Sequence, residues 1–449
     1  MRVLLVSIGL AAAALALAGC QRKSAEEQYD LEIVTPHNDE IQHEFQRGFE
    51  RSVGHPLKIR WVKMGTGELM QYLAGKDRGP DSSLGYDVFF GGGVPEFAHA
   101  AQKGYLEPLT LSAETRAAIP PDIAGVPTAD PDGRWVGAAL SAFGILVNRQ
   151  GLSRQGITLP LRTWQELGDP NMFGWVIVAD ARKSLSVAVA YELILQQHGW
   201  EAGWPILMQI FANARMVTSK STDVPNEVAG GNVLAGPCID MYALAQIAKD
   251  KDHALAYVIP EGGSAITPDP IALLRKPPHR ELAEKFIAFV LSMEGQRLWV
   301  LPKGAAGGPT EAALLRIPIR PDVLDKYHDQ TNVANPYAGG GAGLLRVDGN
   351  LQTARTRLLQ ELTGIALADM EDDLRAAWKA LNAGGRKPAA LEEWRKLPFD
   401  MQRSLEIAKE LREADAAGKD AISAVQAKYA REWQTFFRAK YERVIELSR

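Results

Sequence analysis

Five short segments of the chain combine glycine, hydroxyl and ionisable side chains, and each lies between an apolar run and a helical pattern. The five segments are Thr35–Asn38, Gly65–Glu68, Gly91–Gly93, Arg182–Ser186 and Gly236–Asp240. A turn between a strand and a helix presents free backbone N–H groups and the partly positive end of the helix. Together the five turns are suited to an anionic or strongly polar ligand, although turn geometry and helix capping alone also explain such residues.

The candidate ligand-binding residues belong to these turns or lie close to them in the sequence. They are Thr35, His37, Asn38, Thr66, Gly67, Gly92, Gly93, Lys183, Ser184, Ser186, Asp223, Asp240 and Tyr242. An anion such as a phosphonate or sulfate would use the glycine N–H groups, the hydroxyls and the Lys183 charge. A cationic polyamine would instead use Asp223, Asp240 and the Tyr242 ring. A plain helix-capping loop also accounts for the segment around Asp223.

Short apolar runs alternate with helical patterns from Leu31 to about Ile319, which is typical of an α/β fold with largely parallel sheets. We expect six strands in this part of the chain, at residues 31–35, 58–63, 86–91, 144–148, 176–179 and 233–236. In open parallel sheets, ligands bind beyond the carboxyl ends of the strands. The five turns therefore lie where a ligand cleft is expected.

The N-terminus has the composition of an export signal. Arg2 precedes the apolar stretch 3–17, which is too short to span a bilayer comfortably. The segment Leu17-Ala18-Gly19-Cys20 resembles the bacterial lipobox. We therefore expect a lipoprotein signal peptide at 1–19, a palmitate-type lipid anchor on Cys20 and a polar tether at 20–30. An ordinary signal peptide with an incidental cysteine is the alternative.

The remaining chain has the composition of a water-soluble protein, with 46% hydrophobic and 23% charged residues overall. A net charge of −4 without basic runs argues against nucleic acid as a partner. The chain has two cysteines, so acylation of Cys20 would leave Cys238 without a disulfide partner. We expect Cys238 to be a small buried apolar side chain. The sequence also lacks the Gly-x-Ser-x-Gly, His-Glu-x-x-His and P-loop motifs, so we expect a protein that is not an enzyme.

An ordered series of motifs runs through residues 31–310. It comprises Asp132–Gly137, Phe143–Asn148, Thr163–Leu167, Ala179–Ser184, the segment Ile266–Leu274, and Ala283–Ser292 followed by Glu294-Gly295-Gln296. This series resembles the type 2 periplasmic solute-binding proteins of ABC importers, and most closely their ferric-iron-binding branch.

The resemblance implies a two-lobed α/β fold that closes on a ligand held between the lobes. Lobe one would comprise residues 31–138 plus 264–320, and lobe two residues 139–263. The implied function is that of a monomeric, lipid-anchored periplasmic protein that passes a small solute to an ABC permease in the inner membrane. A lipoprotein that presents its ligand to a sensor is the alternative.

The ligand that the resemblance implies is ferric iron or an iron chelate, as cargo rather than as a resident cofactor. Ferric-binding relatives commonly use two adjacent tyrosines, whereas this chain has Asp240-Met241-Tyr242 at the matching place. The candidate metal ligands are therefore His37, Asp240 and Tyr242, completed by an external anion. Tyr242 as a simple cleft wall and His37 as an exposed polar residue are the alternatives.

The strand pattern ends near Leu345, just after the glycine-rich segment 339–343, which we expect to be a hinge. Residues 345–449 are predicted to form an all-helical C-terminal extension, with helices at 352–363, 367–383, 400–416 and 421–447. Pro398 should interrupt the helical pattern. Apolar stripes at 358–367 and 433–441 need a partner. We expect the extension to pack on itself or against lobe one, outside the ligand cleft.

Overall fold

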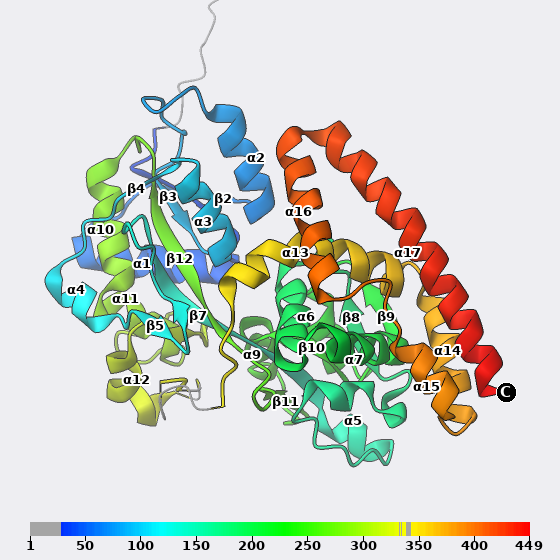
Figure 1. Ribbon diagram of the computed structural model, residues 1–449. Helices are drawn as coiled ribbons and strands as arrows, with labels where there is room; N and C mark the ends of the chain where they lie inside the picture. The colour runs from blue at the N-terminus through cyan, green and yellow to red at the C-terminus, as the bar shows by residue number, and fades with distance from the viewer. Residues whose placement is uncertain (1–27, 332, 334, 338–342) are drawn as a thin grey trace, which may run out of the picture.

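The computed structural model describes residues 28–331, 333, 335–337 and 343–449 (Figure 1). The signal segment 1–19, Cys20, most of the tether and residues 339–342 of the glycine-rich segment lie outside the described residues. Within the described ranges, no helix has both the length and the apolar character that crossing a membrane requires.

Strands and helices alternate along most of the chain. The strands are β1 (Leu31–Thr35), β2 (Ile59–Lys63), β3 (Val88–Phe90), β4 (Leu106–Glu107), β5 (Asp122–Ile123), β6 (Val126–Pro127), β7 (Trp135–Asn148), β8 (Val176–Ala179), β9 (Ala214–Thr218), β10 (Ala235–Ile239), β11 (Leu255–Val258), β12 (Ile266–Leu274) and β13 (Ile317–Pro318). The helices before residue 345 are α1 (Asp39–Val53), α2 (Thr66–Lys76), α3 (Val94–Gln102), α4 (Ala113–Ala118), α5 (Arg149–Arg154), α6 (Leu185–His198), α7 (Trp200–Asn213), α8 (Asp223–Ala229), α9 (Asp240–Ile247), α10 (Arg280–Leu291), α11 (Met293–Val300) and α12 (Pro321–Tyr327).

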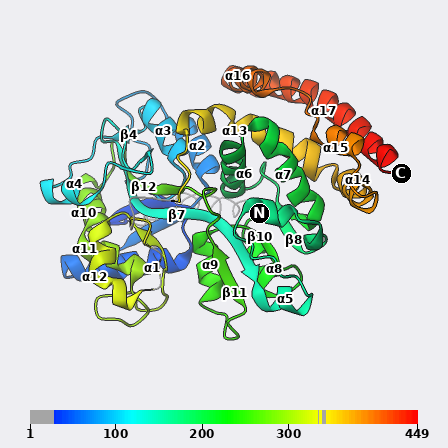
Figure 2. The ribbon, with the colours of Figure 1, turned by 60° about the horizontal axis from the view of Figure 1, so that its bottom comes forward.

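One long strand, β7, belongs to both lobes (Figure 2). The main strand order is β2-β1-β3-β12-β7-β10-β8-β9. The first half of β7 pairs with β12 and β13, and the second half pairs with β10 and β11. All 14 residues of β7 are buried, because each half lies inside a different lobe. The chain therefore passes between the lobes without leaving the sheet.

The strands pair in a mixed sheet, with both parallel and antiparallel neighbours, rather than in the largely parallel sheets predicted from the sequence. β1 runs parallel to β2 and β3 in the first lobe, and β8 runs parallel to β9 and β10 in the second. β7 is antiparallel to β12, β10, β11 and β13. Among the described residues, every antiparallel pair of the main sheet involves β7 or β12, the two strands that meet at the crossing between the lobes.

Gly144 lies at the centre of this crossing. A Cβ atom there would come within 2.4 Å of the Val258 carbonyl oxygen and within 2.9 Å of the Tyr257 hydroxyl. Only glycine lets β11 approach β7 this closely.

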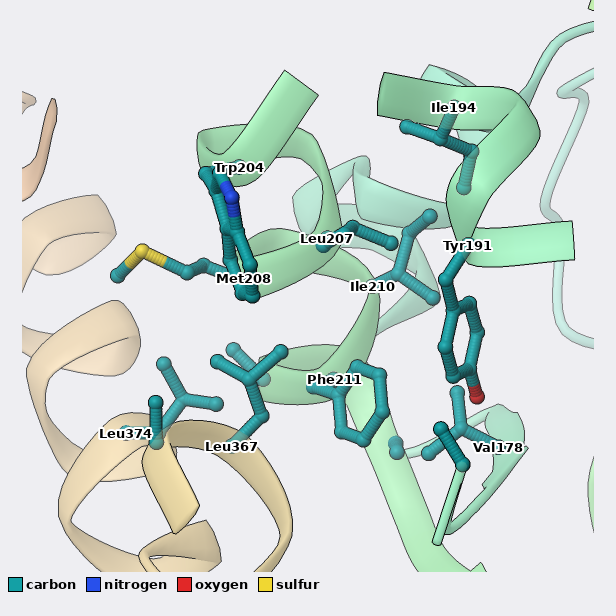
Figure 3. Close-up of a cluster of buried hydrophobic side chains, with 14 of the residues drawn as sticks. Val178, Tyr191, Ile194, Trp204, Leu207, Met208, Ile210, Phe211, Leu367 and Leu374 are labelled. Atoms are coloured by element: carbon teal, nitrogen blue, oxygen red, sulfur yellow. The ribbon is translucent and has the colours of Figure 1, made fainter. Parts of the chain in front are cut away.

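Two groups of buried side chains define the lobes. The cores of the first lobe draw on residues 31–142 and on residues 266–333. The main core of the second lobe begins at Phe143 and extends to Val444, so it includes the C-terminal helices. Figure 3 shows Leu367 and Leu374 of the extension beside Met208 and Phe211 of α7.

The C-terminal extension is helical, as predicted. Its elements are α13 (Gly349–Thr363), a π-helical turn (Gly364–Ala368), α14 (Glu371–Ala383), α15 (Pro388–Arg395), α16 (Met401–Ala417) and α17 (Lys419–Ser448). α15 was not expected, and the chain around Pro398 is non-helical between α15 and α16.

The extension packs on itself, as expected, because α17 contacts α14, α15 and α16, but its further neighbour is the second lobe rather than lobe one. The physical reason lies in α7, where ten of 14 residues are buried, including Trp200, Trp204 and Phe211. A helix that is apolar on all sides needs neighbours on all sides. The extension supplies the missing outer neighbour.

A buried ion pair joins the extension to the second lobe. Arg355 on α13 donates from Nε to both carboxylate oxygens of Glu192 on α6, at 3.0 and 2.8 Å. Both side chains are at most 2% exposed, and the Arg355 guanidinium lies 5.6 Å from the Trp200 ring centroid. The pair fixes α13 against α6.

We predict that Arg355→Met lowers the free energy of unfolding by about 3–5 kcal/mol, because it leaves the Glu192 carboxylate buried without its partner. Urea denaturation measures this loss. The matched control is Arg357→Met on the same helix, where the half-exposed pair with Glu361 is worth less than about 1 kcal/mol. Equal losses in the two variants would contradict the buried pair.

Candidate functional site

A cavity of about 370 Å³ lies between the two lobes. Its polar lining includes His37, Gly92, Gly93, Ser141, Tyr242, Asp269 and Arg316. Its apolar lining includes Val94, Pro95, Phe143, Val189 and Val347. Gly349, Gln352 and Thr353 of α13 complete it, so the extension takes part in the cleft, contrary to expectation.

Arg316 supplies a buried cation to this cavity. Its side chain is 1% exposed, and its Nη1 atom lies 2.5 Å from Asp269 Oδ2. Nη2 donates to Ser141 Oγ at 2.6 Å, and the guanidinium lies 5.3 Å from the Trp299 ring centroid. Nε has no hydrogen-bond partner among the described residues. The guanidinium is thus held in one orientation, and its Nε–H remains able to donate a hydrogen bond.

A β-bulge positions Asp269 against Arg316. The register between β12 and β7 shifts between Asp269 and Pro270. Bulges commonly redirect a side chain near a functional site. Asp269, Arg316 and Ser141 are called the cavity floor below. Asp269 Oδ1 also accepts the Gly92 N–H at 2.5 Å, so this carboxylate connects the Gly91–Gly93 turn to the cavity floor.

His37 is buried and neutral at physiological pH. Burial lowers its pKa to about 4, the effect of nearby Arg316 acts in the same direction, and Asp269 opposes them. The imidazole packs edge-on against Phe90, with ring centroids 4.7 Å apart. Its Nε2 atom has no hydrogen-bond partner among the described residues and lies 3.8 Å from Asp269 Oδ2. A neutral imidazole in this place can donate to or accept from a ligand.

The turn at Gly91 makes room for this imidazole. Gly91 has a φ of +91°, and a Cβ atom there would lie 2.3 Å from His37 Nε2. Any larger residue would displace the ring, so the glycine turn and His37 form one unit.

Four helices begin at the cavity. The lining includes residues at or just before the first turns of α1, α3, α9 and α13, represented by His37, Val94, Met241 and Gly349. Each helix N-terminus carries a partial positive charge. The four N-termini and Arg316 together favour an anionic group in the cavity.

Asp240 lies beside the cavity rather than in its lining. Its carboxylate is 2% exposed, Oδ1 accepts the Met241 N–H at 2.7 Å, and Oδ2 has no partner among the described residues. Burial raises its pKa to about 6, although Arg316 acts in the opposite direction. Cys238 is buried nearby, where burial raises the pKa of its thiol.

Four of the residues predicted from the sequence line the cavity, namely His37, Gly92, Gly93 and Tyr242. Tyr242 is partly buried, and burial raises the pKa of its phenol. His37 is buried rather than exposed.

Two further residues predicted from the sequence, Thr35 and Asn38, are not part of the lining. The Thr35 hydroxyl donates to the Phe90 carbonyl at 2.5 Å and accepts the His37 N–H at 3.1 Å. Asn38 caps α1 by accepting the Ile41 N–H. Both residues hold the His37 turn in shape.

The remaining candidates lie outside the cavity lining. Thr66 and Gly67 begin α2, Lys183 is exposed, Ser184 is buried, Ser186 lies inside α6, and Asp223 accepts a hydrogen bond from the Thr218 hydroxyl. The extension contacts the 182–186 turn. Arg182 of this turn forms ion pairs with the nearby Asp180 and with Asp369 of the extension.

Sequence reasoning missed Arg316, Asp269 and Ser141. A signal for the first two was present, because each charge stands in an apolar stretch, Leu314–Ile319 and Ile266–Leu274. A charge in such a stretch must be paired if the stretch is buried. Ser141 carries no comparable signal.

The proposed metal ligands do not form a clear cation site. His37 and Tyr242 line the cavity, whereas Asp240 does not. In the described part of the chain, no three His, Cys, Asp or Glu residues gather as a possible metal site.

We predict that Asp240→Asn stabilises the protein at neutral pH. The wild-type carboxyl is neutral in both states well below its unfolded pKa of 3.8. As pH rises from about 4 to about 6 the unfolded chain ionises first, which costs the native state up to about 3 kcal/mol. The gain from Asp240→Asn, measured by urea denaturation, should therefore grow between pH 4.5 and pH 7.5. The exposed Asp252→Asn should show no such trend, and a loss at pH 7.5 for Asp240→Asn would refute the prediction.

Comparison of the sequence with known proteins identifies a matching family model and related proteins. Residues 82–325 match the family model of bacterial extracellular solute-binding proteins. The phosphoglycerate transport regulatory protein PgtC of Salmonella typhimurium is 30% identical over 251 residues, which are 55% of this chain and 57% of PgtC. The chain thus spans just over half the length of the curated relatives that it matches.

Solved structures share the fold. The periplasmic binding protein AfuA of Actinobacillus pleuropneumoniae, with fructose 6-phosphate bound, has a TM-score of 0.57 at 18% identity, covering 75% of this chain and 98% of AfuA. Iron-bound HitA of Pseudomonas aeruginosa has a TM-score of 0.55 at 19% identity, covering 74% and 99%.

These structures confirm the predicted two-lobed α/β fold, to which α13–α17 add the helical extension. The family whose model matches is one of solute-binding proteins, in agreement with the expectation that the chain is not an enzyme. The family match covers more than half of the chain. The chain therefore belongs to the bacterial extracellular solute-binding protein family.

Proposed function

We propose that the protein captures a small organic anion between its lobes and delivers it to an ABC-type importer. The observation that carries this proposal is the buried Arg316 guanidinium, held by Asp269 and Ser141 at the floor of the cavity. Arginine is the side chain best suited to carboxylate and phosphate groups, because its planar donors match two oxygens at once.

The cavity walls support an organic rather than an inorganic anion. The cavity has a largely apolar lining, which includes Val94, Pro95, Phe143, Val189 and Val347. A cavity of about 370 Å³ is in the range of small-molecule sites, which combine apolar walls with a few placed polar groups. The carbon skeleton of an organic anion would exclude water from this apolar lining, whereas a bare phosphate or sulfate would leave it hydrated.

The same geometry is less suited to ferric iron. The Arg316 charge would oppose a cation, and the Asp269 carboxylate is already engaged by Arg316 and the Gly92 N–H. Iron-bound relatives share only the fold at the identities found. The anion alternative therefore replaces iron as our proposed ligand.

The relatives point to phosphorylated organic compounds. PgtC is named for phosphoglycerate transport, and AfuA holds fructose 6-phosphate. We include both compounds as probes below, since each combines an anionic group with a carbon skeleton.

Presentation of the ligand to a regulatory sensor is the second candidate function, favoured by the word regulatory in the name of PgtC. The two functions differ in a deletion strain. The strain carries the uptake genes under a constitutive promoter, together with a reporter fused to their native promoter. Loss of uptake of labelled 3-phosphoglycerate would support transport, whereas normal uptake with lost induction of the reporter would support sensing.

We also propose that Cys20 carries a lipid anchor and that residues 20–30 tether the lobes to the periplasmic side of a membrane. The lipobox-like segment 17–20 and the extracellular family support this proposal.

We predict that 3-phosphoglycerate or fructose 6-phosphate raises the unfolding midpoint of the full-length protein in detergent. A hundredfold excess over the dissociation constant stabilises the native state by about 2.7 kcal/mol. A thermal-shift panel with these two compounds, inorganic phosphate, sulfate, putrescine and ferric citrate measures this effect. Strong shifts with ferric citrate or putrescine and none with any anion would overturn the proposal.

The double variant Arg316→Met with Asp269→Asn should abolish the shift while the protein still folds, because it removes both members of the pair. Its matched control is Arg275→Met with Asp77→Asn, which removes a first-lobe ion pair outside the cavity lining. Retained binding in the cavity variant would contradict the role of Arg316.

The anchor is tested by labelling cells with radioactive palmitate. Label should enter the wild-type protein and not Cys20→Ser, since acylation needs the thiol. Cys238→Ser is the control and should label like the wild type. Equal labelling of wild type and Cys20→Ser would rule out the anchor.

A further inference from the structure

The extension and the second lobe are packed together as one body. The two share a core, and Arg355 on α13 is paired with Glu192 on α6. Arg182 binds Asp369 through two hydrogen bonds, and Trp378 Nε1 donates to Asn213 Oδ1 at 2.8 Å. The position of α13 relative to α6 is therefore fixed by packing and by buried polar contacts.

The first turns of α13 lie at the ligand cavity. Figures 1 and 2 place α13 between α3 of the first lobe and α6 of the second. Val347, Gly349, Gln352 and Thr353 all belong to the lining, together with Val189 of α6. The same cavity contains the buried His37 Nε2 atom, which lacks a partner among the described residues. The extension therefore faces the same cavity as the polar floor.

The polar groups that α13 brings are uncharged. Gln352 is a partly buried residue of the lining, and its side-chain amide can both donate and accept hydrogen bonds. The Thr353 hydroxyl donates to the Gly349 carbonyl at 2.8 Å, which leaves its oxygen as an acceptor. The Asp348 carboxylate caps the helix by accepting the Leu351 N–H. Because the Asp348 carboxylate offsets the partial positive charge of this helix end, the side chains of α13 are better suited to hydroxyl or carbonyl groups than to a second anionic group.

We propose that the start of α13, through Gln352, recognises the uncharged hydroxylated body of an organic anion whose charged group is held at Arg316, an inference that rests on the proposed function. The family match ends at residue 325, so this recognition surface is an addition to the shared fold. The extension thereby selects organic anions over inorganic ones.

Isothermal titration calorimetry of the full-length protein in detergent tests this role with 3-phosphoglycerate, fructose 6-phosphate and inorganic phosphate. Gln352→Ala should weaken binding of the organic probes by roughly three- to tenfold, as expected for one lost hydrogen bond, and should leave phosphate unchanged. Gln360→Ala is the matched control, because Gln360 lies on the same helix outside the cavity lining.

The outcomes separate this inference from the function on which it rests. Unchanged affinity of Gln352→Ala for both organic probes, or an equal loss with Gln360→Ala, would overturn the role of α13 and leave the anion site standing. Equal weakening of phosphate and of the organic probes would also overturn it, since selection would be absent. Failure of the wild type to bind any of the three probes would overturn the proposed function and the inference together.

Discussion

The register of β7 determines where Ser141, Asp269 and Arg316 lie at the cavity. Its Ser141 faces Arg316, and β12 carries Asp269 along its first half. β13 pairs with Leu140 and Ala139 of β7, which brings the adjacent Arg316 to the same place. A shift of β7 by one residue would turn these side chains to the opposite face of the sheet. The binding site and the connection between the lobes are therefore one structural element.

Charge compensation at this crossing explains how so many polar groups are buried together. Asp269 is satisfied by Arg316 and by the Gly92 N–H, while His37 stays neutral because of its burial. The atoms left without a hydrogen-bond partner among the described residues include His37 Nε2, Arg316 Nε and Asp240 Oδ2, and they lie at or beside the cavity. Unsatisfied buried groups are costly, and they are tolerated where a ligand can satisfy them.

Local pattern predicted the parts of the structure that depend on local physics. β1 and β8 are apolar runs bounded by turn residues, and the His37 and Gly91–Gly93 turns follow strands, so all were accessible from the sequence. The first half of β7 has no alternation because both of its faces are buried, and β12 is interrupted by Pro268 and Pro270. The Arg316–Asp269 pair joins residues 47 positions apart, and nothing local specifies it. The docking of the extension depends likewise on α7, some 150 residues earlier than α13.

The shared core has a consequence for the order in which the protein matures during synthesis. The cores of the first lobe are complete once Val333 has been made, whereas the main core of the second lobe, begun at Phe143, also requires Val444. The middle of the chain must therefore wait for its last few residues before it can exclude water. Until then the apolar faces of α6 and α7 remain available to chaperones, which bind unfolded chains. The part of the chain that is translated in the middle therefore becomes rigid last.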